Sequence, residues 1–199
     1  MMRIGIDLGG TTVKAALCRE DGTLLHKMNA PTRLGDADGL RADMKALALA
    51  LCEKEAITPE QVQSMDMSDV CFAQAFEPEF QCAVQLDNDA NCAALGEAIA
   101  GAAKDTRNML MITLGTGVGG GIVVDGKLYT GCNGIAGELG HIVIRQGGES
   151  CNCGRKGCLE AYTSASAFVR FAERALEAGR KSVLEENRGA LNAKMICDA

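Results

Sequence analysis

Apolar and polar residues alternate through most of the first thirty positions, with the two-residue period of a β-strand. The alternation predicts three strands, Arg3–Leu8, Val13–Cys18 and Thr23–Asn29. In the first strand Ile4 and Ile6 fall on the same predicted face. The turn Gly9–Thr12 joins the first strand to the second. Short connections of this kind predict an antiparallel meander.

The apolar spacing then lengthens to that of a helix. Leu40, Met44, Leu47 and Leu51 predict a helix over Asp38–Glu55. The sequence Thr-Pro-Glu at residues 58–60 predicts a second helix start, because Pro suits the first helical position. Residues 64–80 and 131–158 show no clear period. Further strands are predicted at Ala83–Leu86, Asn108–Leu114 and Ile122–Val124, and further helices at Asn88–Ala102, Ser164–Ala178 and after Asn192.

The composition is that of an ordinary globular protein. Of 199 residues, 47% are hydrophobic and 23% are charged, which excludes wholesale disorder. The formal net charge of −6 argues against a nucleic acid or an anionic membrane as partner. Arg3 and Asp7 interrupt the only apolar stretch near the start, and no run approaches the roughly 18 apolar residues of a membrane helix. We therefore expect a cytoplasmic protein.

The ten cysteines divide into two groups. Thiols stay reduced in the cytoplasm, so clustered cysteines there indicate a metal more often than a disulfide. Seven scattered cysteines have apolar neighbours and are interpreted as small core residues: Cys18, Cys52, Cys71, Cys82, Cys92, Cys132 and Cys197.

The other three, Cys151, Cys153 and Cys158, follow His141 in the pattern H-x9-C-x-C-x4-C. Three thiolates and one imidazole fill a tetrahedral Zn²⁺ site completely, which predicts a structural metal. Gly154 and Gly157 permit the sharp turns that this spacing needs. The alternative is unligated thiols in a loop, which we disfavour because the segment has few apolar residues to bury them.

Two Gly/Thr turns are candidate phosphate-binding loops. The first follows Asp7 and contains Gly9, Gly10, Thr11 and Thr12; the second follows Thr113 and contains Gly115, Thr116 and Gly117. Glycines let backbone N–H groups approach an anion, and Thr hydroxyls add donors. Asp7 could hold Mg²⁺ through water, and Lys14 could add positive charge. The alternative is two ordinary hairpins.

Three further acidic positions carry candidate chemistry. Asp89, after Asn88, is either part of a simple helix cap or a base that accepts a hydroxyl proton while Asn88 orients the substrate. Glu138 and Glu160 flank the His/Cys cluster. They are either solvated surface carboxylates or, with the far face of His141, acceptors for the hydroxyls of a sugar.

Together these motifs resemble the ROK family of sugar kinases. The matching stretches are IGIDLGGTTVK at 4–14, NDANCAALGE at 88–97, TLGTGVGGG at 113–121, AGELGH at 136–141 and CNCGRKGCLE at 151–160. The resemblance implies an α/β, actin/hexokinase-like (ribonuclease H-like) ATPase fold with two domains, 1–103 and 104–199. It also implies phosphoryl transfer from ATP with Mg²⁺ to a hexose or amino-hexose.

By the same resemblance each candidate residue takes a role. Asp89 is the catalytic base. Asn88, Glu138, His141 and Glu160 contact the sugar, and His141 also binds zinc. The two Gly/Thr turns hold the nucleotide phosphates.

Two departures from the family pattern lead to further expectations. Only Ser64–Phe80 stands where the family has a strand, a Gly-x-Pro-Gly loop and an Asn-Leu segment, so we expect central strands and part of the sugar pocket to be missing. The adenosine-binding segment that would follow 191–199 is also expected to be missing. Little kinase activity is therefore expected, and exposed sheet edges favour aggregation or a homo-oligomer.

Two functions from different classes stay open: a glucokinase-like sugar kinase, and a non-catalytic, zinc-stabilised sugar-binding remnant or pseudokinase. A transcriptional repressor is not expected, because only three residues precede Ile4 and leave no room for a DNA-binding helix-turn-helix.

Overall fold

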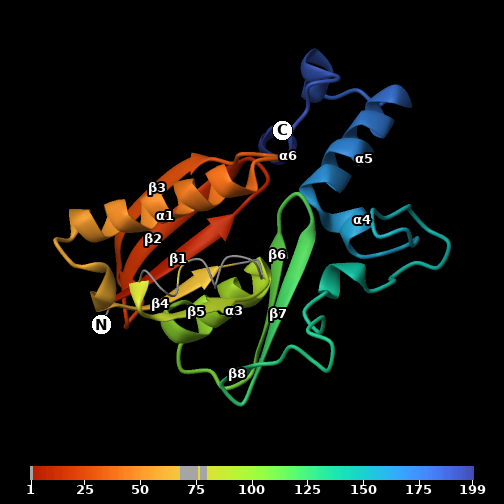
Figure 1. Cartoon of the computed structure of the whole chain (residues 1–199). Helices are drawn as coiled ribbons and strands as arrows, with labels where there is room; N and C mark the ends of the chain where they lie inside the picture. The colour runs from red at the N-terminus through yellow and green to blue at the C-terminus, as the bar shows by residue number, and fades with distance from the viewer. Residues whose placement is uncertain (1, 68–75, 77–79) are drawn as a thin grey trace. The chain divides into compact units, whose positions relative to one another are not determined.

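The computed structural model describes residues 2–67, 76 and 80–199. The chain divides into two compact units, Met1–Thr106 and Arg107–Ala199 (Figure 1). Among the described residues, no helix combines the length and the apolar character needed to cross a bilayer.

The first unit is built on a five-stranded sheet with the order β3-β2-β1-β4-β5. Its strands are β1 (Met2–Leu8), β2 (Thr12–Arg19), β3 (Leu24–Pro31), β4 (Val62–Met67) and β5 (Ala83–Leu86). β1, β2 and β3 pair antiparallel, which confirms the predicted meander, whereas β4 pairs parallel to both β1 and β5.

Helix α1 (Ala37–Lys54) supplies much of the core of this unit. Its N-cap is Asp36, whose carboxylate accepts a hydrogen bond from the Gly39 N–H group at 2.9 Å. Its buried side recurs at helical spacing: Met44, Leu47, Ala48, Leu51 and Cys52. These side chains pack with Ile4 and Ile6 of β1, which are both buried on the predicted face.

The predicted helix start at residues 58–60 is confirmed, with Thr58 as the N-cap and Pro59 in the first helical turn, although the helix is only three residues long. The expected loss of central strands was wrong for the start of Ser64–Phe80, because residues 64–67 belong to a central strand of the sheet. Pro59–Gln61 forms a single 3₁₀ turn (η1), closed by a 2.8 Å hydrogen bond from the Thr58 N–H group to Gln61 Oε1. The chain then becomes extended as β4, which lies in the sheet between β1 and β5. One neighbouring strand, β1, lies more than fifty residues earlier in the chain, and the other, β5, follows only after residues 68–79. The local sequence pattern therefore did not reveal β4. The rest of that segment, residues 68–75 and 77–79, lies outside the described residues.

The last helix of the first unit, α3 (Asp89–Ala100), follows β5 after two residues. It begins where the Asn88 side chain accepts hydrogen bonds from the N–H groups of Ala90 and Asn91, at 2.9 and 3.2 Å. The expected helix start is therefore confirmed, and with it the capping role of Asn88.

The second unit begins with a three-stranded antiparallel sheet of order β6-β7-β8. Its strands are β6 (Met109–Leu114), β7 (Val118–Val124) and β8 (Lys127–Leu128). The strand predicted at Ile122–Val124 starts four residues earlier, because the glycines before it belong to the strand. A Cβ atom on Gly120 would lie 2.6 Å from Leu139 Cδ1, so this glycine permits close packing on β7.

The remaining elements of the second unit are short, apart from one amphipathic helix. They are η2 (Leu139–His141), α4 (Glu160–Thr163), α5 (Ala165–Glu177), η3 (Val183–Asn187) and α6 (Ala193–Asp198). Helix α5 confirms the predicted helix, with Ser164 as its N-cap. The single turn α4 and the 3₁₀ helix η3 were not predicted, because elements this short leave no periodic signal.

The interpretation of the scattered cysteines was correct only in part. Cys52 is buried, and Cys18, Cys82 and Cys92 are partly buried. Cys132 and Cys197 are exposed, so they are not core residues. Cys132 lies in a loop, and Cys197 lies in α6, a short helix without buried residues. Cys71 lies outside the described residues.

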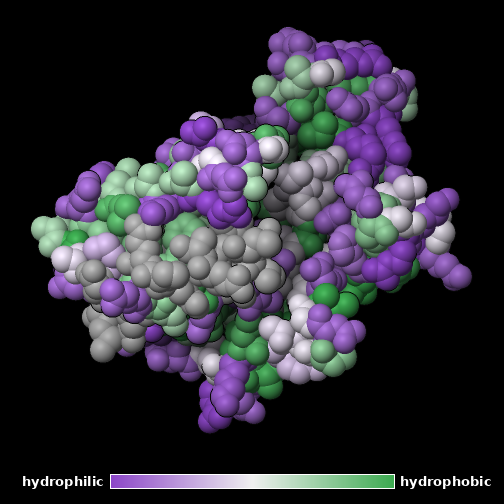
Figure 2. Space-filling model, viewed as in Figure 1, coloured by the Kyte–Doolittle hydropathy of each residue, from purple (hydrophilic) through white to green (hydrophobic). Residues whose placement is uncertain are grey.

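The second sheet repeats the opening meander of the first, although the sequence shows no matching repeat beyond the two Gly/Thr turns. In the first unit β4 adds to β1 on the side opposite β2; within the described residues, no strand occupies the corresponding edge of β6. Leu110, Ile112 and Leu114 of β6 are exposed. Hydrophobic surface is visible over the strands of this unit in Figure 2.

Candidate functional site

The first Gly/Thr turn connects β1 to β2 and is closed by its own backbone. The Gly9 N–H group donates to the Thr12 carbonyl oxygen at 3.1 Å. A Cβ atom on Gly9 would lie 3.0 Å from that oxygen, whereas a Cβ atom on Gly10 would meet nothing within 4 Å. Gly10 has no positive φ angle. Neither strain nor internal packing therefore requires a glycine at position 10, and the open space beside it allows an anion to approach the backbone.

Asp7 and Lys14 face each other across the β1–β2 hairpin at the base of this turn. The Lys14 Nζ atom lies 3.0 Å from Asp7 Oδ2, and both side chains are largely exposed. An exposed pair of this kind contributes about 0–1 kcal/mol to stability. The pair can therefore open at little cost, which leaves a carboxylate for a hydrated cation and an ammonium for a phosphate.

Asn88 and Asp89 stand together at the start of α3. Asn88 Oδ1 is used by the helix cap, and its Nδ2 group makes no hydrogen bond to the described part of the chain. Asp89 is exposed, and its Oδ1 atom accepts from the Ala90 N–H group at 2.8 Å. No described residue bonds to Asp89 Oδ2. The cap and the catalytic interpretation are thus compatible, because they use different atoms.

Sequence reasoning missed the residues that hold this pair in place. Asp87 Oδ1 accepts from the Asn88 N–H group and from Asn91 Nδ2, both at 2.7 Å. Asn91 is buried with its Oδ1 atom unpartnered in the described structure. The only sequence signal that Asp87 and Asn91 support the pair was their position in the same run, Asp-Asn-Asp-Ala-Asn at residues 87–91.

Thr32 was also missed, although it supports the first turn. Its Oγ1 hydroxyl donates to the Gly9 carbonyl oxygen at 2.6 Å, and its N–H group donates to the Thr11 carbonyl oxygen at 3.0 Å. An open groove of ≈ 460 Å³ lies beside it, lined in part by Gly10 and Leu34. Thr32 is twenty residues away along the chain, so no local pattern connected it to the turn.

The second Gly/Thr turn connects β6 to β7. The Gly115 N–H group donates to the Gly117 carbonyl oxygen at 2.9 Å, and Thr116 is exposed. As at Gly10, a Cβ atom on Gly115 would meet nothing within 4 Å. Thr113 lies near the end of β6, in register with Gly119 of β7. Each unit therefore carries a turn whose backbone is open to an anion.

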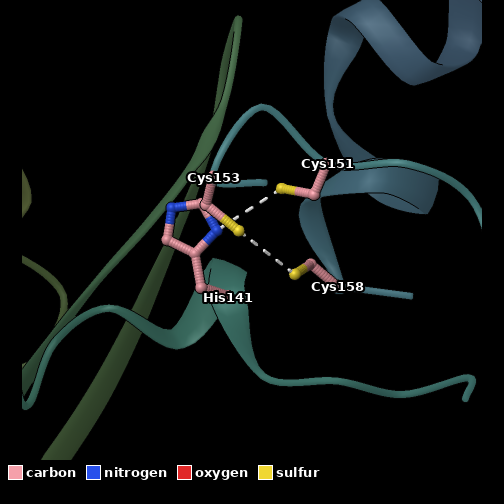
Figure 3. Close-up of side chains that lie close together, drawn as sticks. All are labelled: His141, Cys151, Cys153 and Cys158. Atoms are coloured by element: carbon pink, nitrogen blue, oxygen red, sulfur yellow. Dashed lines mark hydrogen bonds between the residues drawn. The ribbon is translucent and has the colours of Figure 1, made fainter. Parts of the chain in front are cut away.

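His141, Cys151, Cys153 and Cys158 meet in the second unit, and their ligand atoms all lie within 4.8 Å of one another (Figure 3). The His141 Nδ1 atom is 3.6 Å from Cys151 Sγ, and Cys153 Sγ is 3.7 Å from Cys158 Sγ. A tetrahedral ion with metal–sulfur bonds of about 2.3 Å has sulfur–sulfur edges of about 3.8 Å. The four residues therefore fit one tetrahedral metal ion.

Two glycines shape the loop that carries the three cysteines, residues 151–158, here called the metal loop. Gly154 and Gly157 have φ angles of +85° and +84°, as the predicted sharp turns require. Cys151 and Cys158 are buried against Ala161 and Tyr162, while Cys153 is exposed. The expectation that this segment cannot bury thiols was therefore wrong, because the apolar contacts come from α4.

The pKa values of Cys153 and Cys158 are shifted in opposite directions. Hydrogen bonds from the backbone and side chain of Arg155 lower the pKa of Cys153 to about 6. Burial raises the pKa of Cys158 to about 11. Near pH 7 without a metal, Cys153 is largely a thiolate and Cys158 is a thiol. A metal ion that binds both must therefore displace a proton from Cys158.

The two glutamates beside the cluster are placed differently. Glu138 is exposed, and its Oε2 atom lies 3.8 Å from His141 Nε2, on the side of the ring opposite the sulfur atoms. Glu160 begins α4; its Oε2 atom accepts from the Val118 N–H group at 2.9 Å, and its Oε1 atom lies 3.7 Å from Cys151 Sγ. The carboxylate of Glu160 thus already has partners within the protein.

The predicted site residues are divided between the two units. Asp7, the first turn, Lys14, Asn88 and Asp89 belong to the first unit. The second turn, the metal cluster, Glu138 and Glu160 belong to the second.

Two α/β units, each opening with an antiparallel meander whose Gly/Thr turn is open to an anion, define an actin/hexokinase-like protein. The expected fold is thereby confirmed. Residues 3–197 match the family model described as the ROK family, so the chain belongs to the ROK family.

Individual relatives support this assignment. The chain is 37% identical to a glucokinase of Halalkalibacterium halodurans, over 98% of this chain and 67% of the relative. Its structure is similar to a ROK family glucokinase from Streptomyces griseus in complex with glucose and AMPPNP, with a TM-score of 0.73 and 31% identity over 89% of this chain and 62% of that one. It is also similar to a ROK family transcriptional regulator, a homolog of the E. coli MLC protein, with a TM-score of 0.83 and 26% identity over 100% of this chain and 55% of that one.

The chain spans about two thirds or less of the length of these relatives. The match to the Halalkalibacterium halodurans glucokinase extends over 222 positions, more than the 199 residues of this chain. That relative therefore has residues within the matched region that this chain lacks.

Proposed function

We propose that this chain acts in the ATP-dependent phosphorylation of a hexose hydroxyl. The observation that carries the proposal is the arrangement at the start of α3, where Asp89 is exposed with one carboxylate oxygen unpartnered among the described residues. A carboxylate in this position can accept the proton of a sugar hydroxyl as that oxygen attacks a phosphoryl group. Among the solved structures, the identity to the glucokinase is higher than the identity to the regulator, 31% against 26%, which supports a kinase over a repressor.

The other candidate residues support binding and orientation. Asn88 Nδ2 can donate to a sugar oxygen while its Oδ1 atom keeps the helix cap. Glu138, His141 and Glu160 are proposed sugar contacts, and glucose or an amino-hexose suits paired acceptors of this kind. The turns at 9–12 and 115–117 would hold the ATP phosphates through backbone N–H groups and Thr hydroxyls.

Two metal ions accompany this proposal. Asp7 would hold Mg²⁺ through water, and the ion would neutralise charge on the ATP phosphates. Zn²⁺ is the proposed occupant of the cluster formed by His141 and the three cysteines, because sulfur and nitrogen donors in a closed tetrahedron are typical of structural zinc. With four protein ligands the site keeps no open position for a substrate.

A second candidate is a sugar-binding protein without kinase activity. It is favoured by the residues that the Halalkalibacterium halodurans glucokinase has and this chain lacks, together with the missing Gly-x-Pro-Gly motif. Phosphoryl transfer depends on placement, and a displacement of about 1 Å can slow it about 10²-fold. Sugar binding without catalysis tolerates a larger displacement of the site residues than phosphoryl transfer does.

One experiment distinguishes the two functions. The zinc-loaded chain is titrated calorimetrically with glucose, mannose and N-acetylmannosamine, and ADP release is followed with ATP·Mg and each sugar. Sugar-dependent ADP release that Asp89→Asn abolishes supports the kinase. Sugar binding without ADP release supports the binding protein. Absence of both contradicts each proposal.

A further inference from the structure

The second Gly/Thr turn is held by the segment that directly follows the metal loop. Three hydrogen bonds of 2.9 Å make this connection. They run from the Val118 N–H group to Glu160 Oε2, from the Ala165 N–H group to the Gly115 carbonyl oxygen, and from the Ser166 hydroxyl to the Thr116 carbonyl oxygen. The turn at 115–117 is therefore supported from outside its own hairpin.

Of these three bonds, the one that Glu160 accepts is closest to the metal cluster. Glu160 lies two residues after Cys158, which is completely buried. Its second carboxylate oxygen is 3.7 Å from Cys151 Sγ. A Cβ atom on Gly117 would lie 2.6 Å from Glu160 Oε2, so the turn also closes tightly over this carboxylate. One side chain thus touches both the metal cluster and the turn.

The segment that carries His141, on the other side of the metal cluster, also contacts Val118. His141 ends η2, and the residue before it, Gly140, packs on β7 so closely that a Cβ atom would lie 2.0 Å from the Val118 carbonyl oxygen. Val118 is therefore contacted by η2 through its carbonyl side and by Glu160 through its N–H group. A metal ion bound by His141 and the cysteines would join these two segments across the start of β7.

We propose that Glu160 is a positioning residue for the second Gly/Thr turn, and that metal occupancy of the His/Cys cluster controls the order of this turn through Glu160. The relevance of the turn to phosphate binding rests on the proposed function; the coupling itself does not. A metal in the cluster fixes Cys158, and through it the origin of the Glu160 side chain. The Glu160 carboxylate then fixes the Val118 N–H group and the backbone entering β7.

Hydrogen exchange of the backbone amides tests the coupling without nucleotide, sugar or turnover. Exchange at Val118 is measured by NMR for the zinc-loaded chain and after zinc removal by a chelator, with metal content determined in parallel. In the wild type, removal of zinc is expected to speed Val118 exchange about 10- to 100-fold, the effect of losing a hydrogen bond to a charged acceptor. Exchange in β2 of the first unit is expected to stay unchanged.

Two variants of Glu160 separate positioning from general stability. Glu160→Ala is expected to keep one zinc ion, because all four ligands remain, yet to show the fast Val118 exchange with zinc and without it. Glu160→Gln retains an oxygen acceptor and is expected to restore slow exchange in the zinc-loaded state. Glu177→Gln, an exposed change on α5, is the matched control and should behave as the wild type.

Three results would overturn the proposal. The first is Val118 exchange that does not respond to zinc in the wild type. The second is slow Val118 exchange in Glu160→Ala. The third is loss of zinc from Glu160→Gln, which would make Glu160 part of the metal site itself. If Glu160→Ala fails to fold, the zinc response of the wild type and Glu160→Gln still decides the question.

Discussion

Alanine substitutions at the two glycines of the metal loop should weaken metal binding to very different extents. Gly154 and Gly157 share nearly the same φ angle, +85° and +84°. A Cβ atom on Gly154 would meet nothing within 4 Å, whereas one on Gly157 would lie 1.7 Å from the Arg145 carbonyl oxygen. The pair therefore separates backbone strain from steric overlap within one loop.

The magnitudes follow from these two contributions. An Ala residue in the left-handed region costs roughly 1–2 kcal/mol, and this applies to both variants. Overlap in a packed site adds about 1–3 kcal/mol, and this applies to Gly157→Ala alone. Because each 1.4 kcal/mol changes an equilibrium constant about tenfold, Gly154→Ala should bind zinc about 5- to 30-fold more weakly than the wild type. Gly157→Ala should be weaker by about a further 5- to 150-fold.

Competition with a chromophoric zinc chelator at pH 7 measures the three affinities on one scale. Far-UV circular dichroism of the zinc-loaded proteins serves as the control that the variants remain folded. Equal zinc affinities for the two alanine variants would refute the reasoning, since the Arg145 overlap would then have no effect. So would an unchanged affinity in Gly157→Ala.

Three further predictions concern the metal and the proposed base. The chain should bind one Zn²⁺, and Cys153→Ser should lose it; metal analysis that finds no zinc, or full retention in the variant, contradicts the site. Zinc affinity should rise at least tenfold per pH unit from pH 7 to 9, because the ion displaces the Cys158 proton below its pKa of about 11; Cys153, with a pKa of about 6, adds a second proton only at lower pH. A flat profile by chelator competition is the contrary result. If sugar phosphorylation is observed, Asp89→Asn should slow it by about 10²–10⁴-fold with sugar binding largely retained, and near-normal turnover would place the base elsewhere.

Features that depend on neighbouring residues were predictable from the sequence. The alternation that buries Ile4 and Ile6, the buried side of α1 and the Asn88 cap all arise from interactions within one strand, one helix or one turn. The His/Cys cluster was also predictable in part from the sequence. Its ligand types and close spacing indicated a metal, and the structure places the four ligand atoms at distances that a tetrahedral ion requires.

Other features depend on contacts between distant segments, and only the tertiary structure decided them. β4 is a strand because β1 offers it a hydrogen-bonding edge, although its own sequence has no clear period. The sequence pattern assigned the glycines of β7 to a loop. The structure places them in a strand, where Leu139 and Gly140 pack closely against β7. Thr32 and Glu160 support the two Gly/Thr turns from twenty and more than forty residues away. A local pattern records which residues can form an element, but hydrogen bonds and close approaches between remote segments exist only once the chain has folded.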